Sequence, residues 1–171
     1  MKWTYLRLVL FIIPIAIVLP SWPVWAKEDH FKLVGEARMT HLFWDIYDAK
    51  LYTKTGTFQR YQPPIKFSLT YLRNIKAKDI VSATNQQWEH LGQNGLIGKY
   101  DQQLLSMWPD INQGDSLTLL VNDKGISKFY YNQKKVGEIQ DSNFSEQFLA
   151  IWLSPNTSEP DLRAQLIKRS E

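Results

Sequence analysis

The chain has 171 residues, of which 44% are hydrophobic, a formal net charge of +3 and no cysteine. This length and apolar content suffice for one domain with a core of its own. The mild charge, with no long basic run, is not typical of a nucleic-acid-binding protein. The lack of cysteine excludes cysteine-ligated zinc, iron–sulfur clusters, covalently attached haem and thiol catalysis.

Residues 1–26 differ in composition from the rest of the chain. They begin with a positively charged stretch that includes Lys2 and Arg7, continue with an apolar run and end with the small residue Ala26. This order predicts a signal peptide whose removal leaves residues 27–171 as a periplasmic or secreted domain. The alternative is an uncleaved membrane anchor, because the uncharged stretch approaches the roughly 20 residues that span a bilayer.

Hydrophobic periodicity places strands and helices in separate groups along the remaining chain. We expect extended structure over 31–52 with a bulge or break near Gly35, a strand over 65–72, helices over 77–92 and 99–108, three strands between 116 and 139, and helices over 144–153 and 158–168. Asn143 is expected to cap the third of these helices. Grouped strands and helices predict an α+β fold, in which a large antiparallel sheet is covered on one side by helices.

A search for catalytic and metal-binding patterns finds little. No G-x-S-x-G nucleophile motif occurs, and His30, His41 and His90 are isolated from one another. We therefore expect no metal and no cofactor. Asp45 and Asp48 are three residues apart, so on a regular strand they are expected to face opposite sides and not to act as an acid–base pair.

Arg38 is the candidate binding residue. It lies in "VGEARMTHLFW", a segment that otherwise has the composition of buried sheet. A guanidinium in such a place must be paired or must meet a ligand anion, because burying it alone is very costly. Glu36 shares its strand face and offers the alternative, an internal ion pair. Tyr47 is expected to add a hydroxyl donor nearby.

Several motifs in order along the chain carry a resemblance. "VGEARMTHLFWDIYDAKLYT" contains a G-x-a-R segment followed by a vYdAxLY motif, and "FSLTYLRNIKAKDI" is a strand that leads into a helix. A Gly-Asp strand, a meander that ends in G-x-I, and the helix "FLAIWL" follow. In these motifs the sequence resembles the chalcone isomerase-like superfamily, especially its bacterial exported branch. The resemblance covers essentially all of residues 27–171 and implies an open-faced β-sandwich, a large antiparallel sheet with helices packed over it.

The resemblance also implies roles for particular residues. The superfamily contains plant enzymes that close a chalcone to a flavanone, and relatives that bind fatty acids without catalysis. In both, an arginine on the early strand reaches the ligand, and this position resembles Arg38. Tyr47 stands where the isomerases have threonine and the fatty-acid binders have tyrosine. Asn85 corresponds to an isomerase asparagine, but the matching tyrosine is missing, since Lys78 or Asp79 stands there.

The leading hypothesis is an exported, non-catalytic domain that binds a small amphipathic or fatty-acid-like anion in a cleft between sheet and helices. The ligand-binding residues implied are Arg38, Tyr47 and Asn85, and no catalytic residue is assigned. No nucleic-acid partner is expected, and membrane contact is expected only through an uncleaved leader. Three rings are candidates to line the cleft: Phe43, Trp44 and Trp88.

Two alternatives remain open. The first is an intramolecular lyase or isomerase of the chalcone isomerase type, which needs donors at a developing enolate. The second is an envelope interaction protein whose cleft is filled by its own side chains and which binds no small ligand.

Overall fold

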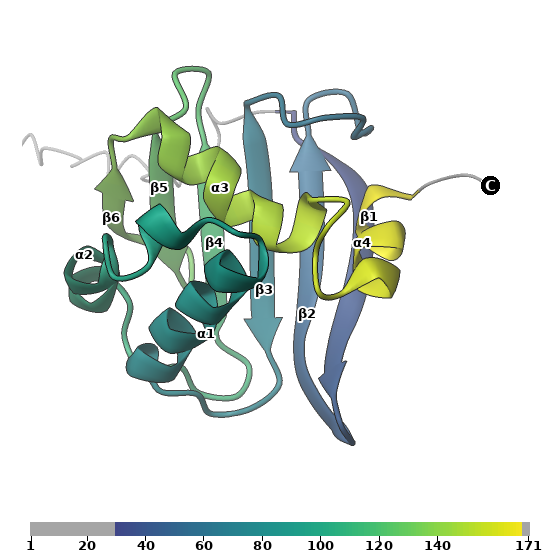
Figure 1. Cartoon of the computed structure of the whole chain (residues 1–171). Helices are drawn as coiled ribbons and strands as arrows, with labels where there is room; N and C mark the ends of the chain where they lie inside the picture. Colours follow the sequence, from purple (N-terminus) through teal and green to yellow (C-terminus); the bar gives the residue numbers. More distant parts are fainter. Residues whose placement is uncertain (1–29, 169–171) are drawn as a thin grey trace, which may run out of the picture.

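The computed structural model describes residues 30–168, so the leader expected over 1–26 lies outside the described residues. A six-stranded sheet, antiparallel throughout, has its strands in the order of the sequence. The helices lie on one face of this sheet (Figure 1). The elements are β1 (Lys32–His41), β2 (Trp44–Thr53), β3 (Ile65–Tyr71), α1 (Ala77–His90), the 3-10 turn η2 (Asn94–Leu96), α2 (Asp101–Met107), β4 (Ser116–Val121), β5 (Ser127–Tyr131), β6 (Lys134–Ile139), α3 (Ser142–Leu153) and α4 (Pro160–Ile167). The α+β, open-faced fold expected from the sequence is confirmed.

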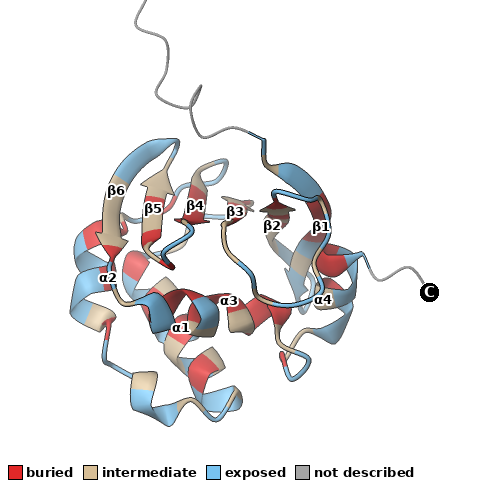
Figure 2. Ribbon diagram, turned by 90° about the horizontal axis from the view of Figure 1, so that it is seen from above, coloured by how far each residue is buried: buried red, intermediate tan, exposed pale blue. Residues whose placement is uncertain are grey.

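The core lies between the sheet and the helices, and the buried positions face this layer (Figure 2). Strand β3 shows the reason, because its residues alternate between buried and half-buried from Ile65 to Tyr71. The buried set of β3 packs on the apolar side of α3, where the rings of Phe67 and Trp152 have centroids 4.8 Å apart. Within residues 30–168, no helix combines the length and the apolar character needed to cross a bilayer.

The extended segment expected over 31–52 is a hairpin of β1 and β2. The bulge expected near Gly35 is confirmed, because Leu33 pairs with Tyr52 while Gly35 pairs with Leu51, and the break between the strands falls at Leu42 and Phe43. In β2 the extra residue is Ile46, because Thr40 pairs with Asp45 while Met39 pairs with Tyr47. A bulge shifts the alternation of side chains by one position. The expectation that Asp45 and Asp48 face opposite sides is therefore wrong.

Helix α3 begins at a different cap from the one expected. The Asp141 side chain accepts a hydrogen bond from the backbone N–H of Asn143 at 3.0 Å, so Asp141 is the N-cap and Asn143 is already helical. Asp141 also accepts a hydrogen bond from the Tyr100 hydroxyl at 2.6 Å. This second contact ties the start of α3 to the start of α2, a long-range pairing that the local sequence does not reveal.

Helix α4 reaches the sheet at Gly35, a buried residue of β1. A side chain at this position would overlap the backbone carbonyl oxygens of Gln165 and Leu166 in the last turn of α4. Backbone atoms cannot rotate away as a flexible side chain can. Gly35 is therefore required by the close approach of helix and strand.

Replacing Gly35 by alanine should force α4 away from β1 and lower the free energy of unfolding by about 1–3 kcal/mol, the usual range for overpacking. Urea denaturation measures the change. Gly95→Ala is the matched control, because a methyl group added at Gly95 would meet no atom within 4 Å. Equal stability for the two variants would contradict the close approach.

Candidate functional site

A cavity of about 320 Å³ lies between the sheet and helices α1 and α3. Its volume is at the lower end of the range for small-molecule sites, about 300–1,000 Å³. The walls are largely apolar and come from both layers. Representative lining residues are Met39, Leu69 and Leu117 from the sheet, and Ile80, Phe148 and Trp152 from the helices.

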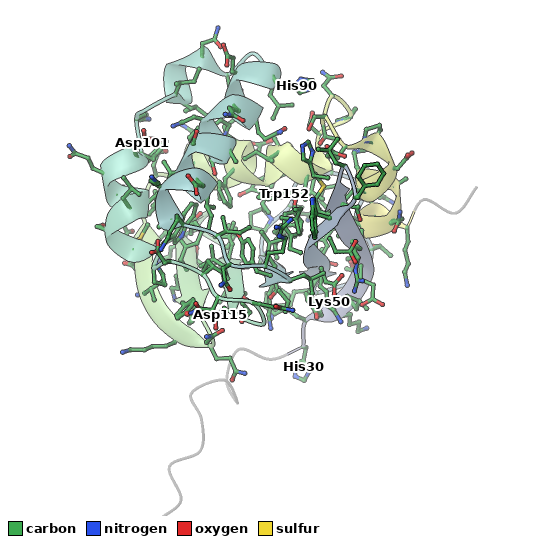
Figure 3. The ribbon with its side chains drawn as sticks, turned by 90° about the horizontal axis from the view of Figure 1, so that it is seen from below. His30, Lys50, His90, Asp101, Asp115 and Trp152 are labelled. Atoms are coloured by element: carbon green, nitrogen blue, oxygen red, sulfur yellow. The ribbon has the colours of Figure 1, made fainter. Side chains whose placement is uncertain are left out.

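Tyr47 places a hydroxyl in the wall of this cavity. Its oxygen accepts a hydrogen bond from Trp152 Nε1 at 2.9 Å, and its ring meets the edge of Tyr71 with centroids 5.9 Å apart. Trp152 projects from α3 into the interior of the molecule (Figure 3). Burial raises the pKa of Tyr47 to about 12. The hydroxyl therefore stays protonated at neutral pH and keeps its hydrogen for donation.

The charged residues that line the cavity are acidic. Asp79 on α1 and Glu159 before α4 contribute carboxylates, and His41 contributes an imidazole. Among the described residues that line the cavity there is no lysine or arginine. Two hydrogen bonds link α1 to the α3–α4 connection: Ser158 Oγ donates to Gln87 Oε1 at 2.8 Å, and His90 Nε2 lies 3.1 Å from the Asn156 carbonyl oxygen. The described chain also has no group of three acidic or histidine side chains placed to hold a metal ion.

Trp108, which follows α2, also lines the cavity. Its indole N–H is buried and meets no hydrogen-bond acceptor among the described residues. The ring itself packs against Phe129 and Phe148, with centroid distances of 5.4 and 6.0 Å. A buried donor without a partner is uncommon in folded proteins and calls for a physical explanation.

Arg38 lies on the other face of the sheet, which no helix covers. Its side chain is 52% exposed. Nε and Nη2 donate to the two carboxylate oxygens of Asp48 at 2.7 and 3.0 Å, and Nη1 donates to Asp45 at 3.0 Å. These bonds, chiefly those to Asp48, raise the pKa of Arg38 above its usual value. The expectation of a buried guanidinium is wrong, because Ala37 and Met39 take the inward positions of β1.

The alternative pairing of Arg38 with Glu36 is also wrong. Glu36 forms an ion pair with Lys50 Nζ at 3.0 Å on the exposed face. The apolar run that suggested burial is the hairpin tip, where Leu42 is 78% and Phe43 96% exposed. Beside this tip is a wide, open groove on the surface, to which Arg38 contributes. An open surface of this kind does not enclose a ligand.

Asn85 forms hydrogen bonds within the helical layer. Its Nδ2 donates to Asp101 at 2.8 Å, and its Oδ1 accepts from the backbone N–H of Gly98 at 3.2 Å. These bonds fix the connection between α1 and α2, and Asn85 does not line the cavity. Of the rings expected in the cleft, Trp44 is exposed and Trp88 is part of the fully buried core.

The family model described as chalcone isomerase-like matches residues 19–168. The chain belongs to the chalcone isomerase-like family. A Haemophilus influenzae protein is 26% identical over 148 residues, which cover 85% of this chain and 72% of that protein. The crystal structure of an Arabidopsis thaliana fatty-acid binding protein is similar, with a TM-score of 0.62 and 11% identity, over 81% of this chain and 87% of that chain. At this identity the structural likeness shows the fold.

In this chalcone isomerase-like domain, only one of the three binding residues expected from the sequence lines the cavity. Tyr47 does so, whereas Arg38 and Asn85 do not. Asp79 lines it as well, and the resemblance had given Lys78 or Asp79 as the place where the isomerases carry a tyrosine. Glu159 was missed, because it lies in a turn before α4 with no motif of its own.

Replacing Tyr47 by phenylalanine should leave the Trp152 N–H without its acceptor. A buried unpaired donor costs about 1–3 kcal/mol, so we expect a loss of stability of that order in urea denaturation. Tyr52→Phe is the control, because Tyr52 is on the same strand and faces outward. A larger loss for Tyr52→Phe than for Tyr47→Phe would argue against the Tyr47–Trp152 bond.

Tyr47→Phe should also change how the free energy of unfolding depends on pH. The pKa of Tyr47 rises from 10.0 in an unperturbed tyrosine to about 12 in the folded protein. Above pH 10 the unfolded chain loses this proton while the folded chain keeps it, so stability falls as pH rises towards 12. The fall over this window should be shallower for Tyr47→Phe than for the wild type.

Proposed function

We propose that this chalcone isomerase-like domain binds a small, largely apolar ligand in the cavity between sheet and helices, and that it does not catalyse a reaction. The observation that carries the proposal is the cavity itself, which has apolar walls from both layers and the Tyr47 hydroxyl in one of them. Natural ligand sites combine apolar walls with a few placed polar groups in this way.

The energetics of the site favour occupation. An apolar ligand that leaves water gains roughly 25 cal/mol for each Å² of apolar surface buried. The open volume of about 320 Å³ weighs against a cleft that is filled by its own side chains.

The lining supports a binding role over the lyase alternative. Closing a chalcone requires donors that stabilise a developing enolate and groups that orient the attacking phenolate. Here two carboxylates line the cavity, and they oppose the build-up of negative charge. The structurally similar Arabidopsis protein is a fatty-acid binding protein, which supports a ligand with a long apolar portion. Export of the domain is part of the proposal and is supported by the sequence of residues 1–26.

Blocking the cavity should abolish binding. Ala83 on α1 lines the cavity at a position that is also solvent-exposed, so a tryptophan there can enter the mouth without breaking the core. We expect Ala83→Trp to lower the amount of co-purified apolar ligand about tenfold or more, which corresponds to about 1.4 kcal/mol of lost binding. Mass spectrometry of extracts from the purified protein measures it. Ser82→Trp, exposed and outside the cavity, is the control and should retain the ligand; equal retention by both would contradict the proposal.

Removing Arg38 should leave ligand binding intact. The guanidinium is on the opposite face of the sheet, bonded to Asp45 and Asp48. We expect Arg38→Ala to retain the ligand within about twofold of the wild type, as surface substitutions away from a site usually do. The same extraction experiment measures this. A loss as large as that of Ala83→Trp would mean that the ligand lies on the outer face.

A further inference from the structure

We infer that the ligand of this cavity carries an uncharged hydroxyl as its polar end, and that a free carboxylate, such as that of a fatty acid, is selected against. This inference rests on the proposed function, because it concerns the ligand of the same cavity. It departs from the fatty-acid-like anion expected from the sequence.

The first argument is the charge of the lining. The acidic residues of the lining are Asp79, which is solvent-exposed, and Glu159, which is half-buried. His41 adds an imidazole, and among the described lining residues there is no lysine or arginine. A ligand carboxylate would lose hydration inside the cavity and would meet like charges instead of a cation. Its affinity would therefore be lower than that of an uncharged molecule with the same apolar tail.

The second argument is that two cationic side chains, one on β1 and one just before α1, are bonded to carboxylates elsewhere. Arg38 binds Asp45 and Asp48 on the outer face. Lys76, which precedes α1, donates to Asp110 Oδ2 at 2.9 Å. Neither side chain lines the cavity.

The start of α1 offers no free anion site either. Helix N-termini bind anions through unpaired backbone N–H groups. Here the backbone N–H of Ala77, the first residue of α1, donates to Asp110 Oδ1 at 3.0 Å. Asp110 thus occupies the position that a ligand carboxylate would need. The described lining therefore offers a ligand carboxylate no lysine or arginine side chain, and Asp110 already occupies the first N–H of α1.

The third argument is the set of hydrogen bonds that the cavity lining offers to a ligand. Tyr47 accepts a hydrogen bond from Trp152 and keeps its own hydrogen to donate. Glu159 is a hydrogen-bond acceptor of the same cavity, and its charge is felt at the Tyr47 hydroxyl, where it adds to the rise in pKa caused by burial. A ligand hydroxyl can accept from Tyr47 and donate to Glu159. A carboxylate can accept from Tyr47 but has nothing to donate to Glu159.

Decanol and decanoate test the inference, since they share an apolar tail and differ in the polar end. Each is titrated at neutral pH into the wild type, Glu159→Gln and Asp161→Asn, and binding is followed by the fluorescence of the cavity tryptophans. Asp161 is the matched control because it is acidic, exposed and on α4 but does not line the cavity. An alcohol also enters any apolar site more readily than a carboxylate does, so the change made by Glu159→Gln is the decisive comparison.

We expect the Kd of the wild type for decanol to be about tenfold or more below its Kd for decanoate. Glu159→Gln should narrow this ratio about threefold or more by improving decanoate binding, and Asp161→Asn should leave it unchanged. Decanoate binding as tightly as decanol to the wild type would overturn the inference and leave the proposed function standing. A ratio that Glu159→Gln does not change would also overturn it. Binding of neither compound would overturn the proposed function itself.

Discussion

The alternation of side chains along the β1–β2 hairpin decides which residues meet a ligand. Successive residues of a strand point to opposite faces, so a shift of one position exchanges the interior for the solvent. Met39 and Tyr47 pair with each other and face the helices, whereas Arg38 and Asp48 pair one step away and face the solvent. The place of the Tyr47 hydroxyl in the cavity wall and the exposure of the Arg38 guanidinium both follow from this register.

The bulge at Ile46 explains the charged cluster on the outer face. By adding a residue to β2 it brings Asp45 to the same side as Asp48, and one guanidinium can then bond both. Bidentate contacts of this kind fix geometry as well as charge. Arg38 therefore bridges β1 and β2 at the bulged end of the hairpin, on the face of the sheet away from the cavity. In this domain the early-strand arginine acts as a structural residue behind the site.

Much of the architecture could be predicted because it depends on local patterns. The alternation in β3 and the helical spacing in α1 and α3 are read directly from the residues, and the grouping of strands and helices indicates the layers. The residues of the site were harder to predict, because they depend on the register of the strands. A bulge moves Asp45 to the other face without any change in composition, and an exposed tip such as Leu42 and Phe43 resembles a buried strand. Glu159 enters the cavity only through the packing of α4 on the sheet.

The central claim is that the inner cavity, and not the exposed hairpin tip, is where an apolar ligand binds. Nuclear Overhauser contacts between bound decanol and the labelled protein test it most directly. The account predicts contacts from the decanol chain to Tyr71 and Phe148, which line the cavity from the sheet and from α3. Contacts to Phe43 and Trp44 at the hairpin tip, with none to Tyr71 or Phe148, would contradict it.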